Sequence, residues 1–168
     1  AAGGEGVGAA ALEAGVIYSG DIPGHGDNVL CLCTHHTRSE LASSGGKDSV
    51  VMLWDIERGQ PLRRTPLDQN PLDLTFGRGT SEGILFVALD REPIGDVEQA
   101  DGMVMCMNVE TGQQVQHIPC SKSGHVSCLH CSAAGDTFLI GAADGSVRQY
   151  STRDGHLIFS YASGMADV

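Results

Sequence analysis

Three segments of this 168-residue sequence repeat one pattern in the same register. They begin at Asp48, Asp101 and Asp144, and each Asp is followed by a large apolar residue six positions later and by a Gly eleven positions later. Asp-Gly and Asp-Ser favour tight hairpin turns, and the later Gly favours a second turn. Because the unit recurs roughly every 40–50 residues, the sequence predicts a repeat protein built from one small supersecondary unit.

Each repeat contains four short segments typical of β-strands. After the Asp the apolar residues alternate, which places Val51, Leu53, Val104, Cys106 and Val147 on one shared face. One further strand follows the later Gly, and two precede the Asp. These further strands are expected at 29–33, 41–44, 61–62, 72–76, 84–89, 115–118, 126–131, 137–140 and 157–161. Four short strands in such a unit are typical of a propeller blade.

Two dipeptides in the first repeat point to a known family. Gly24-His25 stands at the start of the repeat and Trp54-Asp55 follows its third strand. With these motifs the sequence resembles the WD-repeat (WD40, Trp-Asp repeat) β-propeller family from about residue 24 to residue 161. The resemblance implies an all-β fold of about three four-stranded blades. Since closed propellers have 4–8 blades, we expect a partial or open propeller.

The repeats also suggest a domain organisation. Residues 15–168 are expected to form the propeller segment, and residues 1–14 form either a Gly/Ala-rich linker or the remnant of a degenerate N-terminal half blade. The expected blades are 25–64, 70–119 and 122–161.

The family resemblance implies a structural hydrogen-bond relay in the first blade. It joins His25, Ser44, Asp48 and Trp54, because a buried carboxylate needs donors and a Trp indole N–H needs an acceptor. The other repeats keep the Asp, at Asp101 and Asp144, but lack the full set. We therefore interpret these residues as structural and not catalytic.

Partner-binding residues are expected in the loops next to the relay. In the first blade these are Asp27, Asn28 and Lys47, with Ala100 and Ala143 as smaller counterparts. A second candidate is the insertion at 90–99, whose acidic residues include Asp90, Glu92, Asp96 and Glu98. It is either a binding site for a basic segment of a partner protein or a solvated surface loop.

The charge balance narrows the choice of partners. Ten basic and 21 acidic residues give a formal net charge of −11, which disfavours binding to nucleic acid or to an anionic membrane surface. No apolar run approaches the roughly 20 residues that cross a bilayer, and the first residues lack the features of a signal peptide. We expect an intracellular, cytoplasmic protein.

The six cysteines give the alternative from another functional class, a thiol- or metal-dependent enzyme that uses Cys128, His130 and Cys131. However, Cys128 and Cys131 fall on an expected strand, where residues three apart face opposite sides. Cys31 and Cys128 align in the repeat, and both are interpreted as small core residues. No hydrolase or phosphate-binding motif is present. The sequence therefore predicts no metal and no cofactor, and the leading hypothesis is a non-catalytic protein–protein interaction scaffold within a larger propeller or a multi-protein complex.

Overall fold

The computed structural model describes residues 22–38, 41–90, 102–121 and 124–161. In these residues the secondary structure is almost entirely β, with one short 3₁₀ helix, η1 (Gly79–Ser81). The strands are β1 (Val29–Thr34), β2 (Leu41–Gly46), β3 (Val50–Asp55), β4 (Gln60–Pro66), β5 (Asn70–Phe76), β6 (Ile84–Asp90), β7 (Gly102–Asn108), β8 (Gln114–Ser121), β9 (Val126–Cys131), β10 (Thr137–Ala142), β11 (Val147–Ser151) and β12 (Leu157–Tyr161).

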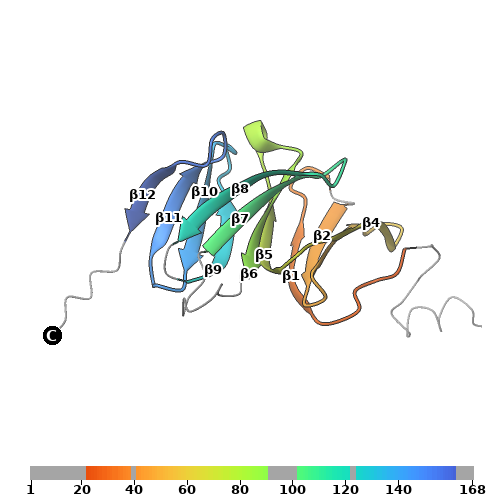
Figure 1. Ribbon diagram of the computed structural model, residues 1–168. Helices are drawn as coiled ribbons and strands as arrows, with labels where there is room; N and C mark the ends of the chain where they lie inside the picture. Colours follow the sequence, from red (N-terminus) through yellow and green to blue (C-terminus); the bar gives the residue numbers. More distant parts are fainter. Residues whose placement is uncertain (1–21, 39–40, 91–101, 122–123, 162–168) are drawn as a thin grey trace, which may run out of the picture.

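These strands form three separate antiparallel sheets, each of four consecutive strands. The first blade is β1–β4, the second is β5–β8 and the third is β9–β12. The blades stand side by side, and the first strand of the second blade, β5, packs between β1 and β9 (Figure 1). The outermost strands are β4, β8 and β12. This arrangement confirms the predicted all-β partial propeller.

The turns confirm the repeat at the level of single residues. Gly59, Gly112 and Gly155 stand eleven positions after the three Asp residues, and their φ angles are 64°, 73° and 71°. This left-handed conformation costs a residue with a Cβ free energy that glycine does not lose. The recurring Gly therefore marks the same turn, between the third and fourth strands, in every blade.

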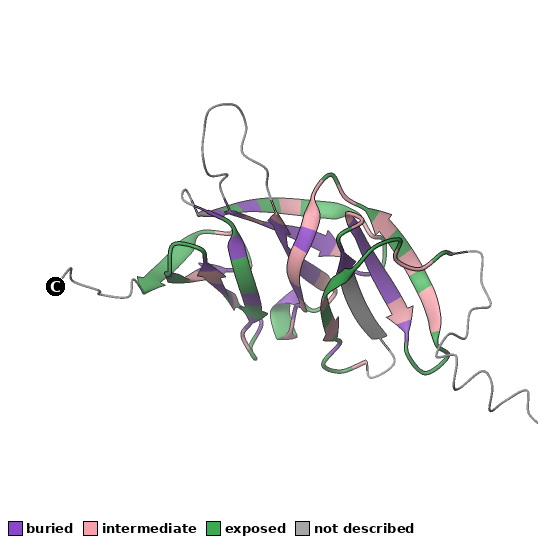
Figure 2. Ribbon diagram, turned by 90° about the horizontal axis from the view of Figure 1, so that it is seen from below, coloured by how far each residue is buried: buried purple, intermediate pink, exposed green. Residues whose placement is uncertain are grey.

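The core lies in two layers between the blades. Leu53 of the first blade packs with Leu85 and Met107 of the second, and Phe86 of the second packs with Phe138 and Ile140 of the third. The second blade is buried on both faces, as the purple strands in its middle show (Figure 2). This burial explains why β6 is apolar almost throughout and does not alternate.

The predicted shared face is confirmed for the first two blades. Val51 and Leu53 pack against the second blade, and Val104 and Cys106 pack against the third. Val147 occupies the matching position in the third blade and is 44% exposed, because no described residue covers that face. We call it the open face of the third blade, and its large exposed apolar residues are Leu139, Val147, Phe159 and Tyr161.

The open face also corrects one expectation from the sequence. Cys31 is half-buried and packs against the core between the first and second blades, whereas Cys128 is exposed. Its cross-strand neighbour is Gly141 of β10. The two cysteines occupy matching places in the repeat, but within the part of the chain that the structure describes only Cys31 has a following blade to cover it. The interpretation of Cys128 as a core residue was wrong.

Candidate functional site

One edge of the propeller collects the loops in which the sequence places the binding residues. Strands β1, β5 and β9 begin at this edge, and β2, β6 and β10 end there, because neighbouring strands are antiparallel. We call this edge the Asp-turn rim. Its described residues include Asp27, Asn28, Lys47, Asp48, Asp90, His125, Ala143 and Asp144.

A main-chain hydrogen bond shapes the Asp-turn rim in the same way in two blades. In the first blade, the amide of Lys47 donates to the carbonyl oxygen of Asn28 at 2.8 Å. In the third blade, the amide of Ala143 donates to the carbonyl oxygen of His125 at 3.0 Å. His125 therefore stands where Asn28 stands, a match that sequence reasoning missed. The available signal was that each residue directly precedes the first strand of its blade.

The candidate partner-binding residues of the first blade lie together on this rim. Asp27, Asn28 and Lys47 are all exposed. The Asp27 carboxylate accepts a hydrogen bond of 2.7 Å from the amide of Asn28. Because Lys47 is bonded to Asn28 through the main chain, the structure brings the three predicted residues into one exposed cluster. The cluster presents one acid, one amide and one base to solvent.

Asp48 sits directly behind this cluster and joins three segments of the chain. Its Oδ1 atom lies 3.0 Å from Nδ1 of His25, which donates because a carboxylate accepts. Its Oδ2 atom accepts from the amide of Gly26 at 2.8 Å and lies 4.0 Å from the Arg64 guanidinium. The side chains of His25 and Asp48 are only 4% and 11% exposed. Sequence reasoning found His25 but missed Arg64.

The net effect of these contacts is to lower the pKa of the Asp48 carboxyl. Burial alone raises this pKa, because a carboxylate loses hydration. The hydrogen bonds from the Gly26 amide and from His25 act in the opposite direction and outweigh it. Gly46 makes the approach feasible, since a Cβ at that position would collide with both the Asp48 carboxylate and the His25 ring. Asp48 is therefore held as an anion that fixes the turn.

The other two residues of the predicted relay are described to different degrees. The Trp54 ring is tilted against the His25 ring, with 6.4 Å between the ring centroids. Ser44 lies in β2, where its main chain pairs with Met52 of β3. The side chain of Ser44 is outside the described part of the structure. The structure thus brings His25, Asp48 and Trp54 together.

Asp144 fixes its turn with a different set of partners. Its carboxylate accepts from the Ser146 hydroxyl at 2.5 Å and from the Ser146 amide at 3.0 Å, and it forms an ion pair with Arg148. The Ser146 hydroxyl makes the largest contribution to lowering the pKa of Asp144 to about 2. The Asp144 side chain is 23% exposed, about twice as much as that of Asp48. The hydroxyl of Ser146, two residues away in the sequence, thus replaces the distant His25 that contacts Asp48 in the first blade. Asp101 of the second repeat lies outside the described residues.

The acidic insertion also starts from the Asp-turn rim. Asp90 ends β6, is half-buried, and pairs through its main chain with Asn70 at the start of β5. Glu92, Asp96, Glu98 and Ala100 lie outside the described residues. Asp90 is therefore the one member of the predicted acidic set that the structure places.

The residues of the enzyme alternative do not converge. Cys131 is fully buried, and its Sγ atom lies 3.8 Å from the carbonyl oxygen of Thr137 and 3.7 Å from the Ser81 hydroxyl. Cys128 and His130 are exposed on the opposite face of β9. Among the described residues, no group of three His, Cys, Asp or Glu side chains is placed to hold a metal ion.

The comparison with known families agrees with this geometry. The family model described as "WD domain, G-beta repeat" matches residues 17–55 and 112–151. The chain carries WD repeats. The second match begins just before β8 and ends with β11, so one WD repeat comprises the outer strand of one blade and the first three strands of the next. This repeat therefore ties the second and third blades together covalently.

Curated relatives cover most of this WD-repeat chain. The small ribosomal subunit protein RACK1z of Oryza sativa subsp. japonica is 32% identical over 144 residues, which are 84% of this chain and 39% of that protein. Eukaryotic translation initiation factor 3 subunit I of Xenopus tropicalis is 26% identical over 147 residues, 84% of this chain and 42% of that protein. The chain thus spans about two fifths of the length of these relatives.

Solved structures show the same fold for the WD repeats. The crystal structure of the RRP9 WD40 repeats superposes with a TM-score of 0.69 at 15% identity, covering 85% of this chain and 41% of that one. The structure of U3-55K gives a TM-score of 0.68 at 16% identity, covering 84% of this chain and 41% of that one. Across the described residues there is no helix long and apolar enough to cross a membrane.

Proposed function

We propose that this chain is a non-catalytic scaffold that holds other proteins together through its Asp-turn rim. The observation that carries the proposal is the repeated main-chain bond at this rim, Lys47 to Asn28 and Ala143 to His125. It fixes the loop backbones on packed blades while leaving the side chains exposed. A rigid surface of this kind loses little conformational entropy on binding, which favours affinity.

The relatives support a place in a multi-protein assembly. One is named as a small ribosomal subunit protein and the other as a subunit of a translation initiation factor. Each is thus a component of a larger assembly. We extend to this chain only that general property, together with the expected location inside the cell, in the cytoplasm.

The open face of the third blade supports a larger propeller. Its exposed apolar residues occupy the places that pack against the following blade in the first and second blades. Exposed apolar surface of this kind is typical of an interface. The proposal therefore includes a further blade, from the same protein or from a partner, on this face. Blade boundaries at 25–64, 70–119 and 122–161, with a linker or degenerate blade at 1–14, belong to the same proposal.

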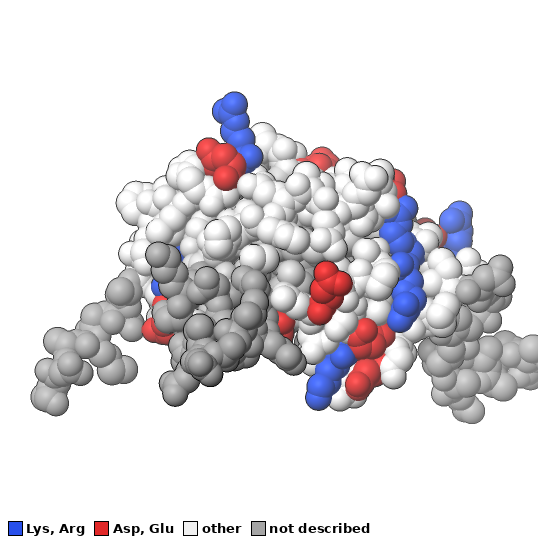
Figure 3. Space-filling model, viewed as in Figure 1, with Lys and Arg blue, Asp and Glu red and all other residues white. Residues whose placement is uncertain are grey.

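A basic segment is the partner chemistry that the charge favours. The chain carries a net charge of −11, and the rim contributes Asp27 and Asp90. Glu92, Asp96 and Glu98 follow Asp90 in the sequence. Figure 3 shows acidic side chains beside several of the Lys and Arg side chains. The face of the molecule in that view therefore presents no continuous basic surface for nucleic acid. We propose that a Lys- or Arg-rich protein segment binds the rim.

A pair of charge reversals tests the scaffold. Asp27→Lys changes the Asp-turn rim, and Glu57→Lys makes the same change at an exposed position of the β3–β4 turn on the opposite edge. Each tagged variant is purified from its source cells beside the wild type, and the co-purifying proteins are quantified by mass spectrometry. We expect Asp27→Lys to lose a partner that Glu57→Lys keeps, with equal melting temperatures. Equal partner sets for all three proteins would refute the rim as the binding surface.

A further inference from the structure

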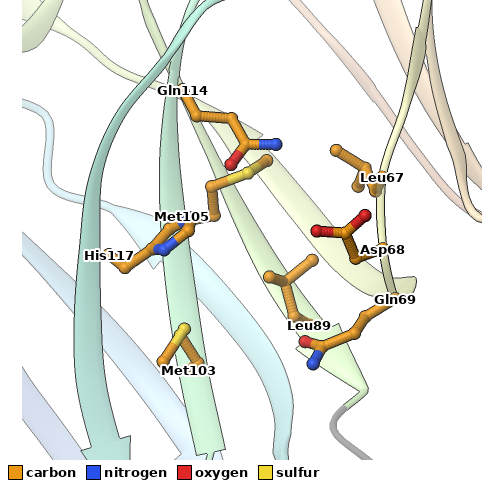
Figure 4. Close-up of a pocket in the computed structure, with 8 residues that line it drawn as sticks. All are labelled: Leu67, Asp68, Gln69, Leu89, Met103, Met105, Gln114 and His117. Atoms are coloured by element: carbon orange, nitrogen blue, oxygen red, sulfur yellow. The ribbon is translucent and has the colours of Figure 1, made fainter.

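A cavity of about 190 Å³ lies between the first and second blades. The segment 67–69, which connects β4 to β5, forms one wall, and β6, β7 and β8 form the other (Figure 4). The lining residues are Leu67, Asp68, Gln69, Leu89, Met103, Met105, Gln114 and His117. Two thioethers and one imidazole therefore line one small cavity.

The strand register places these three residues next to one another. Met103 and Met105 are two residues apart on β7, so both side chains leave the same face of the sheet. His117 of β8 is the cross-strand partner of Met105. Side chains at paired positions of antiparallel strands have their Cβ atoms about 5 Å apart. Figure 4 shows His117 beside Met105, with Met103 one step further along β7 and Asp68 facing them across the cavity.

This donor set matches one class of metal ion. Thioethers are soft, uncharged ligands that select Cu(I), and imidazole also binds copper. Hard cations such as Mg²⁺ and Ca²⁺ require oxygen ligands instead, and Asp68 is the one carboxylate in the lining. We propose that Met103, Met105 and His117 form a binding site for Cu(I), with Asp68 adding negative charge beside it.

The accessibility of the ligands fits this proposal. Met105 is 1% exposed and Met103 is half-buried, whereas His117 is exposed at the outer strand. An ion can therefore enter past His117 and reach sulfur atoms that are shielded from water. Burial raises the pKa of the thiols of Cys31, Cys106 and Cys120 to about 12. These thiols stay protonated near neutral pH, whereas a thioether needs no deprotonation before it binds a metal.

The opposing interpretation is that the two methionines only fill space, as flexible thioethers often do in protein cores. Met107 provides the matched control. It lies on the same face of β7 as Met103 and Met105 and is fully buried in the core between the first and second blades. It does not line the cavity. A metal site engages Met103 and Met105 and leaves Met107 unchanged.

Silver titration of the full chain tests the site, because Ag(I) is a soft monovalent ion without redox chemistry under these conditions. The protein carries ¹³C-methyl methionine and Cys128→Ser, which removes the exposed thiol. We expect one equivalent of Ag(I) to shift the methyl signals of Met103 and Met105 and the ring signals of His117. The signals of Met52 and Met107 stay in place. Shifts that spare Met103 and Met105 would overturn the proposal.

Variants separate the site from packing. Met103→Leu combined with Met105→Leu conserves volume and is expected to remove the one-equivalent binding of Ag(I), and of Cu(I) supplied under reducing conditions in competition with a chromogenic chelator. Volume-conserving changes of this kind are usually tolerated by protein cores, and thermal melting verifies the fold. Met107→Leu is expected to bind as the Cys128→Ser parent does. Retained binding in the double variant would assign the metal to other ligands and overturn the proposal.

Discussion

The carboxylate of Asp73 accepts a hydrogen bond of 2.8 Å from the main-chain amide of Leu129. Asp73 lies on β5 and Leu129 on β9, so this bond joins the innermost strands of the second and third blades. The other oxygen of the Asp73 carboxylate accepts a hydrogen bond of 2.9 Å from the main-chain amide of Leu74. Leu129 is buried in the core between these blades. A charged group thus completes the hydrogen bonding of a strand that belongs to another sheet.

Removing this link should loosen the third blade. Asp73→Ala leaves the buried amide of Leu129 without its acceptor, which we expect to lower the free energy of unfolding by about 1–3 kcal/mol. Asp73→Asn retains an oxygen acceptor and should lose less. Urea denaturation followed by the fluorescence of Trp54 measures both, with the exposed Glu57→Ala as the control. Equal stability of Asp73→Ala and the control would show that the bond does not hold the blades together.

Asp48 should be important for stability although it lies at the candidate binding surface. Asp48→Ala removes the acceptor for the Gly26 amide and for the His25 ring. Because the His25 side chain is only 4% exposed, we expect a loss of about 1–3 kcal/mol in the free energy of unfolding. The exposed neighbour Asp27 serves for comparison, and Asp27→Ala should melt like the wild type in calorimetry. Equal melting temperatures for Asp48→Ala and Asp27→Ala would show that Asp48 has no part in fixing the turn.

Ser49 holds a backbone conformation that usually belongs to glycine. Its φ angle is 56°, and Gly145 occupies the matching turn position of the third blade with φ of 78°. The Ser49 hydroxyl donates to the Asn70 side chain at 2.8 Å and so links the first blade to the second. Ser49→Gly relieves about 1 kcal/mol of strain and loses a hydrogen bond of about the same value, so it should be nearly neutral.

Ser49→Ala separates the two effects of that substitution. It keeps the strained backbone and loses the hydrogen bond, so we expect it to be less stable than Ser49→Gly by about 1 kcal/mol. Chemical denaturation of the two variants measures the difference. A more stable alanine variant would contradict the left-handed conformation at this turn.

The Asp144 turn should weaken in acid. Hydrogen bonds from Ser146 and the ion pair with Arg148 lower the pKa of this carboxyl from 3.8 to about 2. A lowered pKa in the folded state means that its stabilising effect is complete above about pH 4 and is lost as the pH falls towards 2. Wild type and Asp144→Asn should therefore differ most in unfolding free energy near neutral pH and least near pH 2. A difference that stayed constant across this range would exclude the carboxylate as its source.

The repeat made most of the fold predictable from the sequence. Asp and Gly at fixed spacing depend on local turn chemistry, and alternation between Val51 and Leu53 depends on the strand period, so both could be recognised without coordinates. The first blade was the clearest case, because His25 and Trp54 accompany Asp48 there and lie close to it in the structure.

The features that escaped sequence reasoning depend on contacts between distant segments. Arg64 reaches Asp48 from β4, and Asp73 reaches Leu129 from another blade. Neither contact leaves a pattern along the chain. The exposure of Cys128 depends on whether a blade follows the third one in space. The pairing of Met105 with His117 depends on strand register, which the sequence indicates only to within a residue or two.

The bonds from Lys47 to Asn28 and from Ala143 to His125 use main-chain atoms alone. A substitution at any of these four positions keeps the bond and changes only the side chain that faces solvent or a neighbouring molecule. Proline at Lys47 or Ala143 is the exception, because proline has no amide hydrogen to donate. Gene duplication of such a unit can thus produce copies whose surfaces diverge while their loops keep one shape. The binding specificity of a blade can therefore change through single side-chain substitutions without a change in loop conformation.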